Sequence, residues 1–509
     1  MQKKYILRFI SLLLLMILAF SSIACNKLMP EIPSEINYER SDIDLCDAYE
    51  SYSVVEEDNS EVSYSGEKEI EVEVEEDIQI VYIEGIPRKI MPQGSLTIVH
   101  FLLDLDYMIY VLENNFALLE VAYWAHGIDY EELSANAREM IEAMEVPCED
   151  MFLAIIVYHF SPLFGTGHFT IFNQSTYNEQ PFDHPGFTDS IGRVNLRLLR
   201  SPLALRFYGD REKNDTAFEV ALESVEEYVG EPARNRFLDG GNPELESLEM
   251  HEIITEIIEE DRIAYIYARS MGALQINEDK IFDFYHEIYG FEHLIIDLRS
   301  NPGGNYRFFL DVVLRPNITE DTEVPLAFVF FIDAPYIRRL EPYLFTPTAY
   351  SGYLTTTEDY RPVSEILTEF DLPEINLSDL KRFQYGAPYS FRRIHVMPRT
   401  EEFENQPAFG GKIWLLTDSR MSSAAQLAAW HSKEIGFATL VGDITGGCAG
   451  GPRTMALMPH TGIAFHFDMF YITDARGRPL EAGTIPHHFN HPGMDALETT
   501  LWLIEQGEY

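Results

Sequence analysis

The sequence predicts an α/β protein with an N-terminal helical domain. Over residues 96–165 the apolar side chains recur at helical spacing, in segments long enough for three or four amphipathic helices. Further along, a strand pattern at 263–268, a helix pattern at 278–289 and a second apolar run at 294–296 follow one another. Such a β–α–β succession is typical of a sheet that is covered by helices.

The overall charge excludes some classes of partner. The 509 residues carry a net charge of −46. Binding to nucleic acid requires clustered Lys and Arg, and so does binding to anionic lipid through a basic surface. The charge serves solubility or, alternatively, attracts basic peptides. The four cysteines show no CxxC or CxxH spacing, so we expect neither a disulfide scaffold nor a structural zinc site, and no cofactor.

The first 25 residues have the pattern of an export signal. Lys3, Lys4 and Arg8 precede an apolar run at 9–20 that is short for a membrane span. Small residues then lead to Cys25, which resembles the cleavage box of bacterial lipoproteins. This implies a lipid on Cys25 and a location on the outer face of a bacterial cell membrane, with membrane contact through the lipid alone. An ordinary secretory signal or an uncleaved anchor is the alternative.

The remaining chain divides by composition. Between residues 31 and 80 there are 18 acidic and 2 basic residues, a composition typical of a solvated tether. The run Glu69–Glu76 alternates strictly and predicts a strand. The predicted organisation is a signal peptide (1–25), an acidic tether (26–66), a small β element (67–95), a helical domain (96–165), a histidine-bearing strand with a connecting region (166–260), and an α/β core (261–505) with an insertion (305–410).

Two apolar strands end in segments suited to chemistry. The first, at 294–296, opens into a polar turn and then into Gly303 and Gly304, whose bare N–H groups suit a developing oxyanion. The second, beginning at Lys412, delivers Ser423 to the start of an Ala-rich helix. Ser423 is either a helix N-cap, which is the common role of serine at this position, or a nucleophile with an oxyanion donor in the N–H of Ala424.

The two segments, in this order, resemble the S41 family of serine peptidases, which includes the tail-specific and C-terminal-processing proteases and the tricorn core protease. The resemblance spans about 96–500 and implies a core with a ClpP/crotonase-like fold. It also implies that Ser423 is the nucleophile and that Gly303, Gly304 and Ala424 form the oxyanion hole. In the processing proteases a lysine is the base, but Cys448 stands at that position here and no lysine occurs from 434 to 509.

The resemblance to the tricorn-like branch supplies the other candidates. His168, in a glycine-rich turn between the helical domain and a strand, is the predicted general base, with an imidazole suited to proton transfer near neutral pH. Glu481 is the predicted acid that orients it. The chain departs from the family pattern at Gly167, where a serine is expected, and at Gln426, where glutamate is common. We expect either that Thr166 or a water connects His168 to Glu481 in place of that serine, or that Ser423, His168 and Glu481 form a simple triad.

These residues predict an extracytoplasmic serine endopeptidase that acts on polypeptides through an acyl-enzyme. The first alternative is an inactive surface lipoprotein that binds peptide or glycan in the same cleft. The second is a metallohydrolase that uses the histidines at 487–491, although the metal-protease motif HExxH is absent. The sequence does not indicate an oligomeric state.

Overall fold

The structure is a computed structural model, which separates the chain into two compact units, Met1–Gly66 and Glu67–Tyr509. The predicted signal peptide with Cys25 and the predicted tether lie outside the residues that the structure describes. No helix in the described part of the chain is long and apolar enough to cross a membrane. The described residues are 72–75, 78–83, 86–90, 96–180, 190–209, 211–230, 249–323, 327–333, 361–389, 395–396, 408–449, 451 and 453–507.

A small antiparallel sheet precedes the helices. Its strands, in the order β1-β2-β3, are β1 (Val72–Glu75), β2 (Ile78–Ile83) and β3 (Ile86–Ile90). They lie within the segment 67–95, where the sequence predicts a β element.

Four α-helices lie in the segment 96–165, where the sequence predicts a helical domain. They are α3 (Ile98–Asn115), α4 (Leu119–His126), α5 (Tyr130–Glu142) and α6 (Glu149–Phe160). The carboxylate of Asp129 caps α5 by accepting the N–H groups of Glu131 and Glu132. Helix α3 packs on α5, and α5 on α6. The side chains that α3 buries recur at helical spacing: Phe101, Leu105, Met108 and Leu112.

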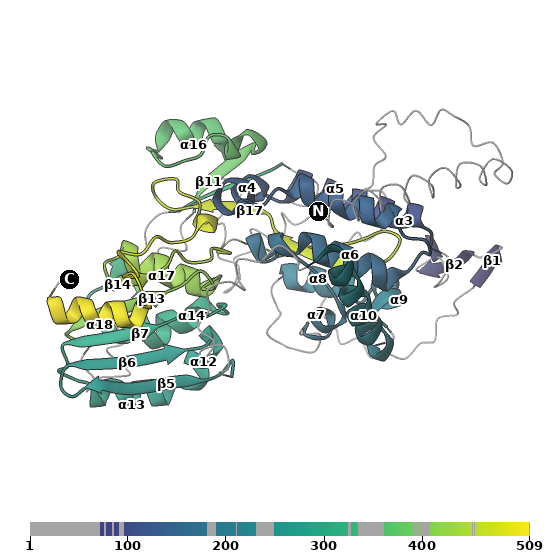
Figure 1. Cartoon of the computed structure of the whole chain (residues 1–509). Helices are drawn as coiled ribbons and strands as arrows, with labels where there is room; N and C mark the ends of the chain where they lie inside the picture. The colour runs from purple at the N-terminus through teal and green to yellow at the C-terminus, as the bar shows by residue number, and fades with distance from the viewer. Residues whose placement is uncertain are drawn as a thin grey trace, which may run out of the picture. The chain divides into compact units, whose positions relative to one another are not determined.

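The connecting region after the histidine turn is also helical. Helix α10 packs against α6 and so extends the helical region (Figure 1). The helices of this stretch are α7 (Gln174–Asn178), α8 (Ser190–Leu199), α9 (Pro202–Tyr208) and α10 (Arg211–Val229).

A six-stranded sheet forms the core. Its order is β18-β14-β13-β7-β6-β5, and all neighbours pair in parallel except β5 and β6, which form an antiparallel edge. The two strands that the sequence analysis singles out, β7 and β13, are neighbours at the centre of the sheet, so their C-terminal ends lie side by side. The strands are β5 (Ile253–Glu259), β6 (Ile263–Ala268), β7 (His293–Asp297), β13 (Lys412–Thr417), β14 (Thr439–Gly442) and β18 (His488–Phe489).

Helices cover both faces of this sheet, which confirms the predicted α/β class with an N-terminal helical region. Helix α18 (Ala496–Gln506) covers one face (Figure 1). The other face carries α12 (Met271–Ile276), α13 (Glu278–Glu287), α14 (Tyr306–Phe309) and α17 (Ala424–Glu434). Neighbouring strand residues point to opposite layers: Leu294, Ile296 and Leu415 to the four helices, and Ile295, Trp414 and Leu416 to α18.

The described part of the insertion 305–410 is built into the fold. Its strand β9 lies between β11 and the core strand β17, in the order β10-β11-β9-β17, and a second pair joins β8 to β12. Backbone hydrogen bonds therefore anchor this segment to the core. Its elements, with β17, are η4 (Leu310–Leu314), η5 (Arg315–Asn317), β8 (Thr322–Glu323), β9 (Ala327–Phe331), β10 (Arg361–Pro362), α16 (Val363–Glu369), η7 (Asp379–Arg382), β11 (Tyr385–Tyr389), β12 (His395–Val396) and β17 (Phe470–Thr473).

A three-stranded antiparallel sheet links the helical region to the core. Its order is β15-β16-β4, formed by β15 (Arg453–Leu457), β16 (Ala464–Asp468) and β4 (Thr170–Ile171). In the register of β4 with β16, Ile171 lies opposite Phe465 and Thr170 opposite His466. Continued by two residues, the same antiparallel register brings His168 level with Asp468.

Two glycines give a matched test of this architecture. A Cβ on Gly442, at φ 134° at the end of β14, would stand 2.0 Å from the carbonyl oxygen of Thr417, whereas Gly436, at φ 67°, has open space around it. We expect Gly436→Ala to lower the free energy of unfolding by about 1 kcal/mol, the cost of its positive φ, and Gly442→Ala by about 4 kcal/mol or more. Denaturant unfolding measures both, and equal losses would contradict the tight packing of Gly442.

Candidate active site

Ser423 lies between the central strand β13 and helix α17. It occupies the capping position of α17, but its hydroxyl makes no capping hydrogen bond, and its backbone has the unusual angles φ 54° and ψ −122°. Its N–H donates to the carbonyl oxygen of Gly447 at 3.1 Å, which holds the serine in this conformation. The N-cap alternative is therefore excluded by the geometry.

His168 ends a tight turn, η3 (Thr166–His168), that follows helix α6 and the short turn η2 (Ser161–Leu163). Gly167 has φ 48°, and a Cβ on it would stand 2.5 Å from Leu118 Cδ1 and 2.7 Å from Phe116 Cε2. A serine does not fit there unless these side chains move. The departure from the family pattern at Gly167 is thus a consequence of the packing between this turn and the helical region.

The imidazole of His168 connects Ser423 to a buried carboxylate. Its Nε2 lies 3.1 Å from Ser423 Oγ, and its Nδ1 lies 2.6 Å from Asp468 Oδ2. The side chain of Asp468 is fully buried, and that of His168 is 14% exposed. Serine, imidazole and carboxylate thus form a continuous hydrogen-bonded series, and Nδ1 needs neither Thr166 nor a water as a relay.

The third member differs from the sequence prediction. Glu481, on the turn η8 (Leu480–Ala482), accepts the N–H of Cys448 at Oε2 with a length of 2.9 Å, while Asp468 occupies the Nδ1 side of His168. The backbone of Glu481 also packs against Gly447. Glu481 therefore holds in place the loop next to the site that carries Gly447 and Cys448. The prediction that Glu481 contacts His168 is corrected to Asp468, which lies in the predicted α/β core at 261–505 without a predicted role.

The predicted oxyanion residues lie in the glycine turn that touches Ser423 and in the residue that follows it, and their N–H groups differ in availability. A Cβ on Gly303 would lie 2.8 Å from both the amide nitrogen of Ala424 and Ser423 Cβ, so the glycine turn touches the serine. The N–H of Gly303 already donates to Asn301 Oδ1 at 2.9 Å. Within the described residues the N–H groups of Gly304 and Ala424 have no acceptor. The site thus offers two backbone donors, from Gly304 and Ala424.

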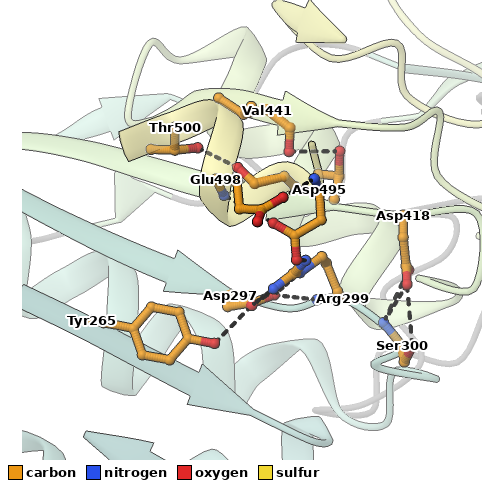
Figure 2. A network of polar contacts seen from close by, with 11 residues as sticks. Tyr265, Asp297, Arg299, Ser300, Asp418, Val441, Asp495, Glu498 and Thr500 are labelled. Carbon is orange, nitrogen blue, oxygen red and sulfur yellow. Dashed lines mark hydrogen bonds and ion pairs between the residues drawn. The ribbon is translucent and has the colours of Figure 1, made fainter. Parts of the chain in front are cut away.

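A buried polar network fixes the turn that carries these glycines (Figure 2). Arg299 makes paired hydrogen bonds to Asp297, which also accepts from Tyr265, and reaches Asp495 at the start of α18 at 2.8 Å. Charge-assisted bonds with this paired geometry are the strong and directional ones. The neighbouring strand β6 and the start of α18 thereby hold the end of β7 in place.

The neighbouring turns are joined through Asp418. Its carboxylate accepts the N–H and the hydroxyl of Ser300 at 2.9 to 3.1 Å, which ties the end of β13 to the end of β7 (Figure 2). Burial raises the pKa of Asp418 to about 6. Since Asp418 lies five residues before Ser423, this contact fixes the serine turn relative to the glycine turn.

Backbone strain concentrates at the site. The non-glycine residues with positive φ in the described chain are His168, Ser300, Ser423, Cys448 and Asp261, and all but Asp261 lie in the turns around the serine. Such conformations cost on the order of 1–3 kcal/mol each and persist where surrounding packing enforces them. Their clustering is typical of a preorganised site.

Gln426 and Cys448 support the site without contacting Ser423 Oγ. The buried amide of Gln426 donates to Leu480 O and Thr484 Oγ1, and accepts from the hydroxyl of Thr445. It therefore binds α17 to the loop that holds Glu481, as a structural residue should. Burial, together with Glu481 and Asp468, raises the pKa of the Cys448 thiol well above its ordinary value, so Cys448 stays protonated and is a poor nucleophile.

The histidines proposed for the metal alternative do not converge. His487 Nδ1 accepts the N–H of Leu440 at 2.9 Å, and the ring of His491 packs against Trp502 at an interplanar angle of 46°. Within the described ranges, no group of three or more His, Cys, Asp and Glu side chains has an arrangement that holds a metal ion.

The histidine borders an open cleft of about 520 Å³. Its described lining includes His168, Ser422, Ser300, Pro302 and Cys448, together with arginines on three separate elements. The imidazole that contacts Ser423 therefore borders a solvent-open space large enough for a peptide segment.

A serine, imidazole and carboxylate in hydrogen-bonded series, beside backbone N–H donors, define a serine-type hydrolase site. The model of peptidase family S41 matches residues 342–488, a segment that contains Ser423 and Asp468. This match confirms the resemblance to the S41 family that is seen in the sequence, and with it the predicted serine-type peptidase.

Several solved structures are similar to this chain at low identity. A putative peptidase from Parabacteroides merdae ATCC 43184 is 13% identical, with 80% of this chain and 95% of that chain covered and a TM-score of 0.42. Mature CPAF in complex with lactacystin is 15% identical, with 80% and 97% covered and a TM-score of 0.44. A lipoprotein from Streptococcus agalactiae is 10% identical, with 80% and 96% covered and a TM-score of 0.37.

The charges around His168 predict its titration. Burial lowers its pKa below 6.5, Asp468 opposes this, and the nearby Arg453 lowers it further. We expect Asp468→Asn to lower the pKa and Arg453→Gln to raise it. NMR titration of the imidazole in a Ser423→Ala background, with the resonance assigned by comparison with His168→Gln, measures both shifts. A shift in the opposite direction for either variant would contradict the geometry.

Proposed function

We propose that the protein is an extracytoplasmic serine endopeptidase that cleaves peptide bonds through an acyl-enzyme on Ser423. The observation that carries this proposal is the 3.1 Å contact between Ser423 Oγ and His168 Nε2, on an imidazole whose Nδ1 bonds to buried Asp468. In a hydrolase of this kind the histidine takes the serine proton as the hydroxyl attacks the carbonyl carbon.

The carboxylate of Asp468 has two tasks in this scheme. It accepts Nδ1–H, which leaves Nε2 as the acceptor for the serine proton. It also stabilises the imidazolium that forms, and the proton then passes from Nε2 to the leaving amine. A water activated by the same imidazole releases the acyl group. Because burial lowers the pKa of His168, the imidazole stays neutral below pH 6.5, and activity falls only as the pH drops through that lowered pKa.

The backbone supplies the electrostatic stabilisation. The N–H groups of Ala424 and Gly304 donate to the oxyanion of the tetrahedral intermediate, and both are free of acceptors in the described structure. The N-terminal end of α17 adds its partial positive charge. Gly303 contributes by close packing against Ser423 rather than by its own N–H, which is engaged by Asn301.

The location outside the cytoplasm rests on the sequence alone. The basic start, the apolar run at 9–20 and the small residues before Cys25 support export and lipid anchoring on the outer face of a bacterial membrane. The acidic segment that follows, if solvated, separates the peptidase from the lipid surface. The polypeptide substrates are then extracellular or envelope proteins.

Labelling by a fluorophosphonate serine-hydrolase probe tests the nucleophile. We expect the full chain to be labelled, and expect Ser423→Ala and His168→Ala each to abolish the labelling because the first removes the nucleophile and the second its base. Ser422→Ala is the matched control, since the Ser422 hydroxyl donates to Pro302 O at 3.2 Å instead. A folded wild-type protein that is not labelled would favour the alternative of a binding protein with a peptidase fold.

The carboxylate assignment has its own test. Asp468→Asn should lower kcat/KM for a cleaved peptide by about 10³- to 10⁴-fold, because the neutral amide does not stabilise the imidazolium and its NH₂ group can hold the imidazole in the wrong tautomer. Glu481→Gln keeps an oxygen acceptor for the N–H of Cys448, so we expect less than about a tenfold loss. Steady-state kinetics of the two variants decides between them. A larger loss for Glu481→Gln would reinstate Glu481 as the orienting acid.

The proposed anchor predicts a chemical modification. Cells that express the full chain in the presence of a radiolabelled or alkyne-tagged fatty acid should incorporate the label, and Cys25→Ala should eliminate it because the thiol is the acceptor. Cys148→Ala, which changes an exposed thiol elsewhere, is the control. Incorporation that survives Cys25→Ala would exclude Cys25 as the lipidated residue.

A further inference from the structure

The charge of the cleft is opposite to the charge of the chain. The full sequence has 83 Asp and Glu against 37 Lys and Arg, yet the described lining of the cleft contains Arg269, Arg420 and Arg453 and no carboxylate. The remaining lining residues are glycine, proline, hydroxyl-bearing residues, histidines and Cys448. A locally positive site on a strongly negative protein requires a specific reason, because the general composition works against it.

Arg269 lines the cleft, and only some of the N–H groups of its guanidinium are hydrogen-bonded. It follows β6, and its Nη1 donates to the carbonyl oxygen of Ser300. Its Nε is buried without an acceptor among the described residues, and it makes no ion pair with them. A guanidinium carries five N–H donors, so most of its donors remain available to a ligand.

Arg453 lines the cleft from β15. In the antiparallel register it lies directly across from Asp468, and residues paired in this way project from the same face of the sheet. Since Asp468 contacts His168, Arg453 projects from the same face of the sheet as the carboxylate that contacts His168. Arg453 is exposed, and the described chain provides no carboxylate for an ion pair with its side chain.

The carboxylates near the cleft are already engaged in its walls. Asp468 is bonded to His168, Glu481 accepts the N–H of Cys448, and Asp418 accepts from Ser300. None of the three lines the cleft. Each is bonded to a residue that does line the cleft, so the three carboxylates lie behind its wall and are engaged there, whereas Arg269 and Arg453 are on the wall itself.

We propose that the cleft selects peptides with an acidic side chain close to the scissile bond, and that Arg269 and Arg453 bind its carboxylate. This rests on the proposed peptidase function and names its substrate class. Guanidinium groups bind carboxylates through paired, charge-assisted hydrogen bonds. A Lys or Arg side chain in the same position meets three like charges, so the cleft rejects the basic peptides that the net charge of the chain attracts at long range.

Internally quenched peptides provide the test on the full chain. Each peptide carries Glu, Gln or Lys at one of the three positions on either side of the scissile bond, and both C-terminal acids and amides are made. We expect kcat/KM for Glu to exceed that for Gln by about ten- to a hundredfold at one position or more, the range for hydrogen bonds to a charged group. The peptide with Lys at that position should have the lowest kcat/KM. Peptides with a C-terminal acid and with a C-terminal amide should have the same kcat/KM.

Variants assign the preference to residues. Arg453→Gln and Arg269→Gln should each bring the Glu/Gln ratio toward one, and Arg269→Lys, which keeps the charge, should retain part of it. Arg476→Gln is the matched control, because Arg476 is an exposed arginine that pairs with Glu374 outside the cleft. We expect the Glu/Gln ratio of kcat/KM for this variant to equal that of the wild type.

The outcomes separate this inference from the proposed function. Fluorophosphonate labelling and peptide cleavage without a preference for Glu would overturn the inference and leave the peptidase assignment intact. So would a preference that follows the C-terminal carboxylate, or one that persists in both Arg→Gln variants. Absence of both labelling and cleavage would overturn the proposed function and, with it, the substrate class.

Discussion

The pairing of the two-residue strand β4 with β16 is the constraint on which the rest of the site depends. It is a short contact between segments about 300 residues apart in sequence, yet its register places His168 level with Asp468. If β4 slipped by one residue, the side chains along it would exchange faces. The imidazole would then lose both its carboxylate and the serine hydroxyl on its other side. The packing of the glycine turn at Gly167 against Phe116 and Leu118 prevents such a slip.

The serine side of the site depends on the central sheet in a similar way. Parallel pairing of β7 and β13 sets the ends of the two strands next to each other, and Asp418 then joins the two turns through Ser300. Gly303 consequently lies so close to Ser423 and Ala424 that a Cβ on it would stand 2.8 Å from each. The buried Arg299–Asp297 network makes this arrangement rigid at the cost of desolvating charges, a cost that paired hydrogen bonds offset. The geometry of the serine site thus depends on two sheets. The three-stranded sheet positions His168 and Asp468, and the six-stranded sheet positions Ser423.

Much of this organisation could be predicted from the sequence, and what could not has a physical reason. Apolar periodicity predicts the helices of 96–165, and the strands before Gly303 and Ser423 follow from short apolar runs bounded by turn residues. Asp468 escaped prediction because its role depends on a long-range strand register that no local pattern encodes. Its only local signal is the alternation Phe465-His-Phe-Asp468, which predicts a strand with His466 and Asp468 on one face. Glu481 was chosen by family resemblance, although its actual partner is the N–H of Cys448.

The order of the site residues along the chain has a consequence for biogenesis. His168 is made early, the glycine turn and Ser423 follow, and Asp468 comes last, in a hairpin that must pair with β4 far upstream. A chain that is still emerging from the ribosome lacks this hairpin, and contacts of such large sequence separation form slowly. The incomplete chain therefore has no assembled nucleophile. The hydrogen-bonded series of Ser423, His168 and Asp468 is complete only when synthesis and folding of the C-terminal part are finished.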